Sequence, residues 1–230
     1  MDNANVGKYG LYTTCPILAR GFFMYEVYAI TDRKYLRNGM SLSQAVALAI
    51  DGGASVVQLR EKEYEGDALK KLALEIQEVC KEKGATFIIN DNVQLAKEID
   101  ADGVHLGQSD MNPAEARKVL GKDKIIGVTA KTVGQAKEAE AAGANYLGSG
   151  AIFATGTKLD AKPLALEDFV SVCSSVSIPV VAIGGITAEN VNYLKNTPMA
   201  GVAVVGGIFD TDDIKSETQK IFNLVTSYRK

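Results

Sequence analysis

Short apolar runs and amphipathic stretches alternate along the chain from residue 24 onward. The apolar runs are rich in valine and isoleucine, which is typical of strands buried on both faces of a sheet. The strands that we expect are Tyr25–Thr31, Ser55–Arg60, Thr86–Asn90, Gly103–Leu106, Ile125–Thr129, Tyr146–Gly150, Pro179–Ile183 and Val202–Val205.

Amphipathic stretches fill the segments between these runs and predict helices. A hydroxyl residue followed three positions later by glutamine forms a capping box, and such boxes open two of the stretches, at Ser41 and Thr132. Glycine ends the first two, at Gly52 and Gly84. The expected helices are 41–53, Glu65–Lys83, Val93–Asp100, Pro113–Leu120, 132–144, Leu166–Cys173, Thr187–Lys195 and Asp213–Tyr228.

Strict alternation of strand and helix defines the expected fold class, which is α/β. Such an order requires a parallel sheet with right-handed crossovers. Eight units in about 205 residues fit a closed (β/α)8 TIM barrel. A doubly wound open sheet is the alternative, but no Gly-x-Gly-x-x-Gly follows the first strand. We therefore expect a single-domain catalytic barrel over residues 24–230.

Residues 1–23 show neither the strand period nor the helix period, and we interpret them as an N-terminal extension. They lack the basic segment and the apolar core of a secretory signal peptide. Either the extension packs on the barrel or Met24 is the natural start of the chain.

The composition excludes several classes of protein. Apolar residues make up 47 % of the chain and charged residues 23 %, as in a soluble globular protein. A net charge of −3 offers no basic surface for nucleic acid, and no apolar run reaches the ~20 residues that cross a bilayer. Cys15, Cys80 and Cys173 form no Cys-x-x-Cys pair, which argues against a disulfide framework or zinc site and favours a reducing cytoplasm.

Two carboxylates follow neighbouring strands, at the end of a barrel where enzymes of this fold hold their active sites. Asp91 follows the third predicted strand and Asp110 the fourth. Converging carboxylates suit Mg²⁺ when a diphosphate supplies its remaining oxygens. The alternative is that each aspartate caps the helix that follows it. Their pairing on adjacent strand ends favours the metal site.

Basic side chains on separate loops of the same end suit a polyanion such as a diphosphate. Solvated surface charge is the alternative interpretation. The set consists of Arg60, Lys62 and Lys158, accompanied by the polar residues Asn90, Thr155 and Thr157. Because Arg60 directly follows an apolar strand, we expect its side chain at or just above the barrel mouth.

Glycine pairs follow the last two strands, as Gly184-Gly185 and Gly206-Gly207. The loops at these places form the common phosphate site of such barrels, where bare N–H groups meet the anion. Tight left-handed turns also need glycine, and this second interpretation is compatible with the first.

His105 is the single histidine, which leaves little material for a His-rich metal site or a Ser-His-Asp triad. It lies in the fourth predicted strand and points opposite to its neighbours. We expect a packed, hydrogen-bonded histidine, with contact to a substrate as the alternative. The cysteines within predicted helices are expected to pack among apolar residues.

Six motifs together resemble the thiamine-phosphate synthase family. They are QLREK at 58–62, IINDN at 88–92, DGVHLGQSD at 102–110, TxTKxD at 155–160, VVAIGGIT at 180–187 and GVAVV at 201–205. The resemblance spans residues 25–228. It implies a transferase that couples 4-amino-2-methyl-5-(diphosphooxymethyl)pyrimidine with hydroxyethylthiazole phosphate. The products would be thiamine phosphate and pyrophosphate, formed through a dissociative, carbocation-like reaction with Mg²⁺ as cofactor.

The resemblance also implies roles for individual residues. Those expected to hold the pyrimidine diphosphate are Gln58, Leu59, Arg60, Glu61, Lys62, Asn90, Thr129 and Lys158. Those expected to hold the thiazole phosphate are Thr155, Gly156, Thr157, Gly185, Val205 and Gly206. Asp91 and Asp110 would hold Mg²⁺. The residues expected to be catalytic are Arg60, Lys62, Lys158 and Thr129.

The chain departs from the family pattern at three positions. Lys131 stands where a histidine is usual, Ala154 where a proline is usual, and Gly206 where a serine is common. The main alternative is a thiazole tautomerase-like isomerase on the same barrel, which needs that histidine and has no use for the set Asp91, Asp110 and Lys158. A phosphate-sugar isomerase and a non-catalytic binding protein are broader alternatives. The sequence does not define the oligomeric state.

Overall fold

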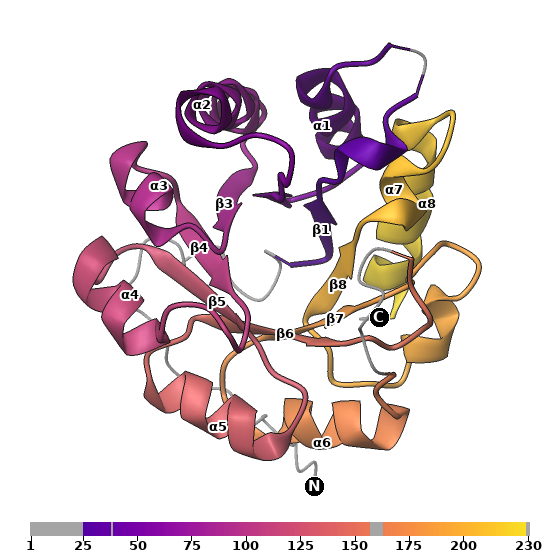
Figure 1. Cartoon of the computed structure of the whole chain (residues 1–230). Coiled ribbons are helices and arrows are strands. Elements are labelled where there is room, and N and C mark those ends of the chain that lie inside the picture. Colours follow the sequence, from indigo (N-terminus) through magenta and orange to yellow (C-terminus); the bar gives the residue numbers. More distant parts are fainter. Residues whose placement is uncertain (1–24, 38, 157–162, 229–230) are drawn as a thin grey trace, which may run out of the picture.

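A closed barrel of parallel strands forms the centre of the computed structural model, which describes residues 25–37, 39–156 and 163–228. Strand neighbours follow the chain order, and β8 pairs with β1 to close the barrel (Figure 1). The strands are Val27–Ile30 (β1), Val56–Leu59 (β2), Thr86–Asn90 (β3), Gly103–Leu106 (β4), Ile125–Thr129 (β5), Tyr146–Gly150 (β6), Val180–Ile183 (β7) and Gly201–Val204 (β8). The expected (β/α)8 fold is confirmed.

Helices surround the barrel on its outside (Figure 1). They are α1 (Leu42–Asp51), α2 (Gly66–Lys83), α3 (Val93–Glu98), α4 (Pro113–Leu120), α5 (Val133–Ala141), α6 (Leu166–Ser175), α7 (Gly206–Phe209) and α8 (Ile214–Ser227), with 3-10 turns η2 (Arg33–Tyr35) and η3 (Val191–Leu194). No helix within the described ranges has both the length and the apolar character needed to span a membrane. The expected N-terminal extension lies outside the described residues, as do Thr157 and Lys158.

One predicted helix is wrong, and one observed helix was not predicted. The helix expected at 187–195 is reduced to the single turn η3. The Asn190 side chain accepts a hydrogen bond from the Thr187 N–H at 2.9 Å and donates to the Gly185 carbonyl at 2.8 Å. These bonds hold the backbone in a turn that competes with a helix. The short helix α7 was not expected, because its two opening glycines have a low helix propensity.

Of the two predicted capping boxes, the one at Ser41 is complete and the one at Thr132 is only half formed. At Ser41 both bonds of the box are present, so α1 begins as expected. At Thr132 the hydroxyl caps α5 by accepting from the Gln135 N–H at 3.2 Å. The Gln135 side chain, however, accepts from the Lys131 N–H at 2.8 Å, which is one residue earlier than in a capping box.

Alternating strand side chains divide the core into a layer under the helices and a second layer inside the barrel. The inner layer contains Tyr28 and Tyr146, both fully buried. The Tyr146 ring crosses the barrel interior above Gly127, where an added Cβ would lie 2.1 Å from the ring carbon Cζ. A glycine at position 127 is therefore required for the tyrosine to fit.

We expect Gly127→Ala to lower the free energy of unfolding by about 1–3 kcal/mol, because overpacking forces the Tyr146 ring or the strand to move. Urea denaturation followed by circular dichroism measures the change. Gly134→Ala is the matched control: Gly134 is exposed on α5, and an added Cβ would make an ordinary van der Waals contact with Thr132 Oγ1 at 3.8 Å. This substitution should raise stability by up to about 1 kcal/mol. Equal effects of both variants would contradict the packing requirement.

Candidate active site

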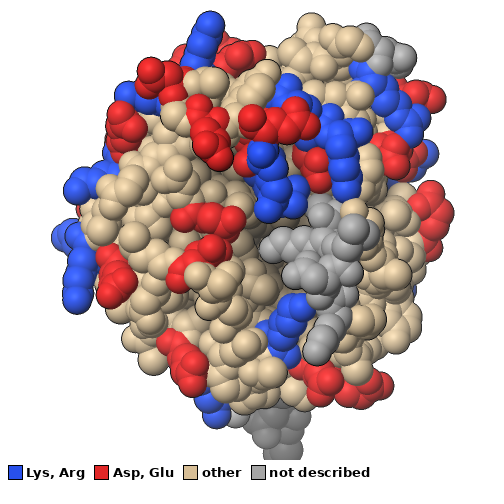
Figure 2. All heavy atoms as spheres, viewed as in Figure 1, with Lys and Arg blue, Asp and Glu red and all other residues tan. Residues whose placement is uncertain are grey.

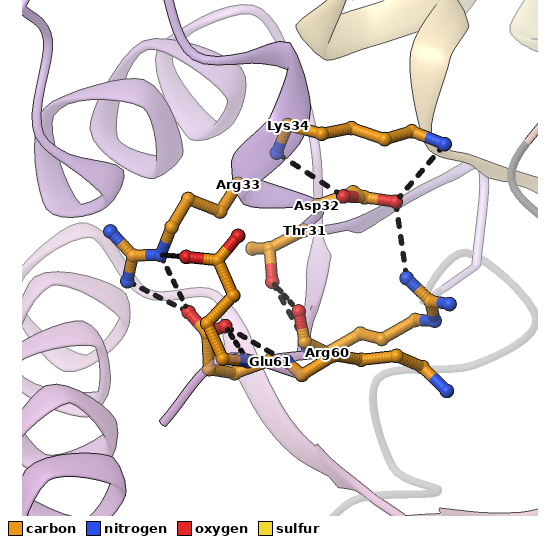
Figure 3. A network of polar contacts seen from close by, with 8 residues as sticks. Thr31, Asp32, Arg33, Lys34, Arg60 and Glu61 are labelled. Carbon is orange, nitrogen blue, oxygen red and sulfur yellow. Dashed lines mark hydrogen bonds and ion pairs between the residues drawn. The ribbon is translucent and has the colours of Figure 1, made fainter.

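Arg60 follows β2 and is held by the chain segment that follows β1 (Figure 3). The Thr31 hydroxyl accepts from the Arg60 N–H at 2.9 Å and donates to the Arg60 carbonyl at 3.1 Å. The Asp32 carboxylate accepts from Arg60 Nη1 at 3.1 Å. Only 11 % of the Arg60 side chain is exposed, so the alternative of solvated surface charge is wrong for this residue.

Glu61 fixes the loop after Arg60. One of its oxygens accepts from Arg33 Nη2 at 2.7 Å, and the other accepts from the N–H groups of Lys62 and Glu63, both at 2.8 Å. Burial tends to raise the pKa of Glu61, but the bonds from these N–H groups and from Arg33 outweigh it, and the pKa lies below its usual value. The carboxylate is therefore committed to Arg33 and to its own loop, whereas the side chain of Lys62 is exposed.

Asp91 and Asp110 do not cap the helices that follow them, so that alternative is wrong. The N-caps are Asn92, which accepts from the Leu95 N–H, and Asn112, which accepts from the Ala114 N–H, each at 2.9 Å. Both aspartates are exposed. Asp91 has a φ of 63°, a left-handed conformation that few residues other than glycine adopt.

Each aspartate is oriented by a neighbouring amide group. The Asp91 carboxylate accepts from Asn90 Nδ2, and its backbone N–H donates to the His105 carbonyl at 2.9 Å. The Asp110 carboxylate accepts from the Gly107 N–H at 2.6 Å.

Two hard oxygen donors at the ends of the paired strands β3 and β4 fit Mg²⁺. In the part of the chain that the structure describes, no group of three or more acidic, histidine or cysteine side chains could hold a metal. The other oxygens would therefore have to come from a bound molecule or from water. Figure 2 shows negative side chains over β3 and β4 and positive ones over β1 and β2 on the same face.

A chain of hydrogen bonds crosses the barrel interior. Gln58 Nε2 donates to the Tyr28 hydroxyl at 2.7 Å, and this hydroxyl lies 2.8 Å from that of Tyr146. His105 Nδ1 lies 2.9 Å from the Tyr146 hydroxyl, and its Nε2 lies 3.0 Å from Thr129 Oγ1. His105 is thus packed and hydrogen-bonded as expected. Burial raises the pKa of both tyrosines, which keeps them neutral.

This chain of bonds connects two predicted binding residues, because Gln58 and Thr129 are its ends. Leu59 differs from these two residues, because its side chain packs in the layer under the helices. Only its backbone is available at the mouth. Asn90 and Thr129 end β3 and β5 and are half-buried.

Glycine is required at the two pairs for different structural reasons. Gly184 and Gly185 have φ values of 104° and 63°, and a Cβ on Gly185 would lie 2.3 Å from the Ala154 carbonyl oxygen. The left-handed turn is therefore confirmed here. Gly206 and Gly207 instead open α7, so a left-handed turn is wrong for them. Gly207 is needed because a Cβ would lie 2.2 Å from the Ile186 carbonyl oxygen.

The two cysteines in the described ranges pack as expected. Cys80 is buried and Cys173 partly buried, and neither forms a disulfide. Burial raises the pKa of each thiol to about 12, so neither is a reactive nucleophile.

Sequence reasoning missed the residues after β1. Asp32 and Arg33 contact two predicted site residues, and Lys34 Nζ donates to the carbonyl of a third, Gly156, at 2.9 Å. Their position after the first strand was the available signal, since every strand of such a barrel ends at the same mouth.

Comparisons with known proteins agree with one another. A family model described as thiamine monophosphate synthase matches residues 27–208. Thiamine-phosphate synthases from Ruminiclostridium cellulolyticum and Clostridium acetobutylicum are 44 % and 45 % identical over 200 and 201 residues, covering 87 % of this chain and 95 % of each relative. A solved structure of thiamine phosphate pyrophosphorylase from Pyrococcus furiosus matches with a TM-score of 0.82 and 33 % identity, covering 90 % of this chain and 98 % of that one.

We expect Glu61→Gln to destabilise the protein at neutral pH and to have less effect in acid. A carboxyl group whose pKa is lowered by folding contributes stability above its unfolded pKa, and this contribution is lost as the pH falls through the folded pKa. Denaturant titrations of wild type and variant at several pH values measure the difference. Glu98→Gln, which removes an exposed ion pair with Lys70, should change stability by less than about 1 kcal/mol. A difference at Glu61 that does not shrink in acid would contradict this role.

Proposed function

The chain belongs to the thiamine-phosphate synthase family, and on that premise we propose that it couples the pyrimidine methyl diphosphate with hydroxyethylthiazole phosphate. The bond between the pyrimidine methylene carbon and the diphosphate oxygen breaks, and its electron pair leaves with pyrophosphate. The thiazole nitrogen then supplies the electron pair of the new C–N bond. The products are thiamine phosphate and pyrophosphate.

The reaction needs stabilisation of the leaving diphosphate more than it needs a base. Arg60 supports this requirement, because the described residues provide an acceptor for its Nη1 alone and its other N–H groups can bind phosphate oxygens. Lys62 is exposed on the same loop. We assign the third cation to Lys158, which lies outside the described residues.

Magnesium is the cofactor that we propose. The observation that carries this proposal is that two asparagines cap the helices, so the carboxylates of Asp91 and Asp110 serve no capping role. These two residues would hold Mg²⁺ together with diphosphate oxygens. When bound, the ion would supply Lewis-acid stabilisation of the leaving group.

The pyrimidine ring is assigned to the ends of the interior hydrogen-bond chain. Gln58 and Thr129 present an amide and a hydroxyl there, and Asn90 lies at the end of β3. The neutral tyrosines behind them add no charge to the pocket. Holding the ring at a fixed distance from the thiazole nitrogen makes the coupling effectively intramolecular, which increases its rate.

The thiazole phosphate is assigned to the loops after β6, β7 and β8. Thr155, Gly156, Thr157 and Gly185 would line one side of it, and the Val205-Gly206 backbone would line the other. Gly206 lacks the hydroxyl of a serine, but the first N–H groups of α7 have no partner within their helix and can bind an anion.

Release of pyrophosphate from the two substrates, with and without Mg²⁺, tests this function. Mass spectrometry should identify thiamine phosphate as the second product. A protein that rearranges the thiazole without releasing pyrophosphate would be an isomerase instead. One that binds both molecules unchanged would be a binding protein.

Asp91→Asn and Asp110→Asn should each reduce turnover by about tenfold or more and raise the Mg²⁺ concentration needed for half-maximal rate, because each removes a charged ligand. Rates measured across a Mg²⁺ titration show both effects. Asn112→Asp is the control: it keeps a side chain that caps α4 and should keep near-normal Mg²⁺ dependence. Normal rates of both aspartate variants at low Mg²⁺ would exclude the metal site.

Lys158→Ala should lower kcat with little change in the KM for the thiazole phosphate. The reason is that a contact to charge developing on the departing diphosphate is strongest in the transition state. Thr157→Ala should do the reverse, raising that KM with a milder effect on kcat. Steady-state kinetics with each substrate varied in turn separate the two. If Lys158→Ala changes only the thiazole KM, this division of the loop between the substrates is wrong.

A further inference from the structure

The segment Thr31–Lys34, which we call the β1 clasp, contacts Arg60 of the proposed diphosphate site (Figure 3). It also contacts Gly156 of the proposed thiazole phosphate site. We propose that Asp32 and Lys34 are positioning residues. Asp32 orients Arg60 toward the diphosphate, and Lys34 joins the same carboxylate to the loop after β6 at Gly156. The β1 clasp would thereby fix the two substrate sites relative to each other. This proposal rests on the proposed function.

The two carboxylate oxygens of Asp32 have separate partners. Oδ1 accepts from the Lys34 N–H at 3.3 Å and caps the turn η2. Oδ2 lies 3.1 Å from Arg60 Nη1 and 3.7 Å from Lys34 Nζ. Capping thus accounts for one oxygen only. The second lies between two cations that come from different parts of the chain.

The Arg60 guanidinium is fixed from two directions. Thr31 bonds to both the N–H and the carbonyl of Arg60, which fixes the backbone where the side chain begins. Asp32 holds one nitrogen at the far end. Because the guanidinium is planar, one held nitrogen and a fixed backbone restrict the directions of the remaining N–H donors. Donors oriented before the substrate arrives need no rearrangement during the reaction.

Burial makes this ion pair a strong constraint. The side chains of Asp32 and Arg60 are 13 % and 11 % exposed. Water and salt screen such a pair less than they screen charges on an open surface. Lys34 is more exposed, at 44 %, but its Nζ has a defined acceptor in the Gly156 carbonyl, 2.9 Å away.

Gly156 gives the β1 clasp its second connection. It belongs to the loop proposed to bind the thiazole phosphate, whereas Arg60 belongs to the loop proposed to bind the diphosphate. The contacts run from Arg60 through Asp32 and Lys34 to Gly156. Movement of either loop is therefore opposed by the other through one carboxylate and one ammonium group.

Asp32→Ser separates positioning from capping. Serine retains an oxygen that can cap η2, but its side chain is too short to reach Arg60. We expect kcat to fall about tenfold, while the KM for the pyrimidine diphosphate changes less than about threefold, because orientation is lost and the cation remains. In an Arg60→Ala background, Asp32→Ser should cause no further loss of kcat, since two residues acting as a unit are not additive.

Lys34→Met tests the second connection. Its removal should raise the KM for the thiazole phosphate several-fold, and Lys34→Gln, which can still donate to Gly156, should restore part of the loss. A Lys34 that binds the diphosphate directly would instead raise the KM for that substrate, which would overturn the assignment.

Asp51→Ser is the matched control for both positions. Asp51 pairs with Lys83 at 2.7 Å, where α1 and α2 end, and no site residue takes part. Its kinetics should equal those of the wild type. An equal loss in this control, or unchanged kinetics in Asp32→Ser and Lys34→Met, would refute the positioning role.

The wild-type rate in the same assay distinguishes the two levels of the proposal. A wild type that forms no thiamine phosphate refutes the proposed function and the positioning role with it. An active wild type with unaffected β1 clasp variants refutes the positioning role alone.

Discussion

A barrel interior has to be filled, and in this protein two tyrosine side chains do much of the filling. Their hydroxyl groups are fully buried, and a buried hydroxyl without a partner costs about 1–3 kcal/mol. Tyr28 and Tyr146 therefore bond to each other, to Gln58 and to His105. That requirement fixes the position of the Gln58 side chain directly and that of Thr129 through the histidine. Packing at the centre of the barrel therefore determines where these polar groups lie at its mouth.

At the barrel mouth, asparagines and aspartates that lie close together in sequence have different roles. Asn92 and Asn112 cap the helices after β3 and β4, and the aspartates that precede them hold their carboxylates among amide groups. An asparagine caps a helix as well as an aspartate does. Because neutral residues cap the helices, the two carboxylates are not needed as caps, which is consistent with the proposed metal site. The backbone of Asp91 is left-handed, a strained conformation of the kind found at binding sites.

Local pattern predicted the fold well, because strand burial and helix amphipathicity depend on nearby residues. All eight strands occur where the apolar runs predict them, and α2 ends at Gly84 as expected, with this glycine in the left-handed conformation. Local pattern failed where one side chain overrode it, as at Asn190 in the reduced helix.

Local pattern also failed to predict contacts between residues that are distant in sequence. Asp32 and Arg60 are separated by 28 positions, and neither residue alone shows that they form a pair. The same is true of Lys34 and Gly156, which are 122 positions apart. The site residues recognised from motifs were those that would contact substrate. The residues that hold those site residues in place, such as Asp32 and Lys34, belong to none of the sequence motifs.

An acidic residue beside Arg60, the arginine proposed to bind the diphosphate, has an electrostatic consequence. Asp32 neutralises part of the Arg60 charge, which weakens the attraction that the free protein exerts on a diphosphate. It also restrains the guanidinium, so that its remaining donors keep one orientation. Weaker attraction raises the free energy of the bound substrate, whereas fixed donors lower that of the transition state if they are aligned with the developing charge. Since only the difference between these two free energies accelerates the chemical step, a buried carboxylate at this position favours turnover over tight binding.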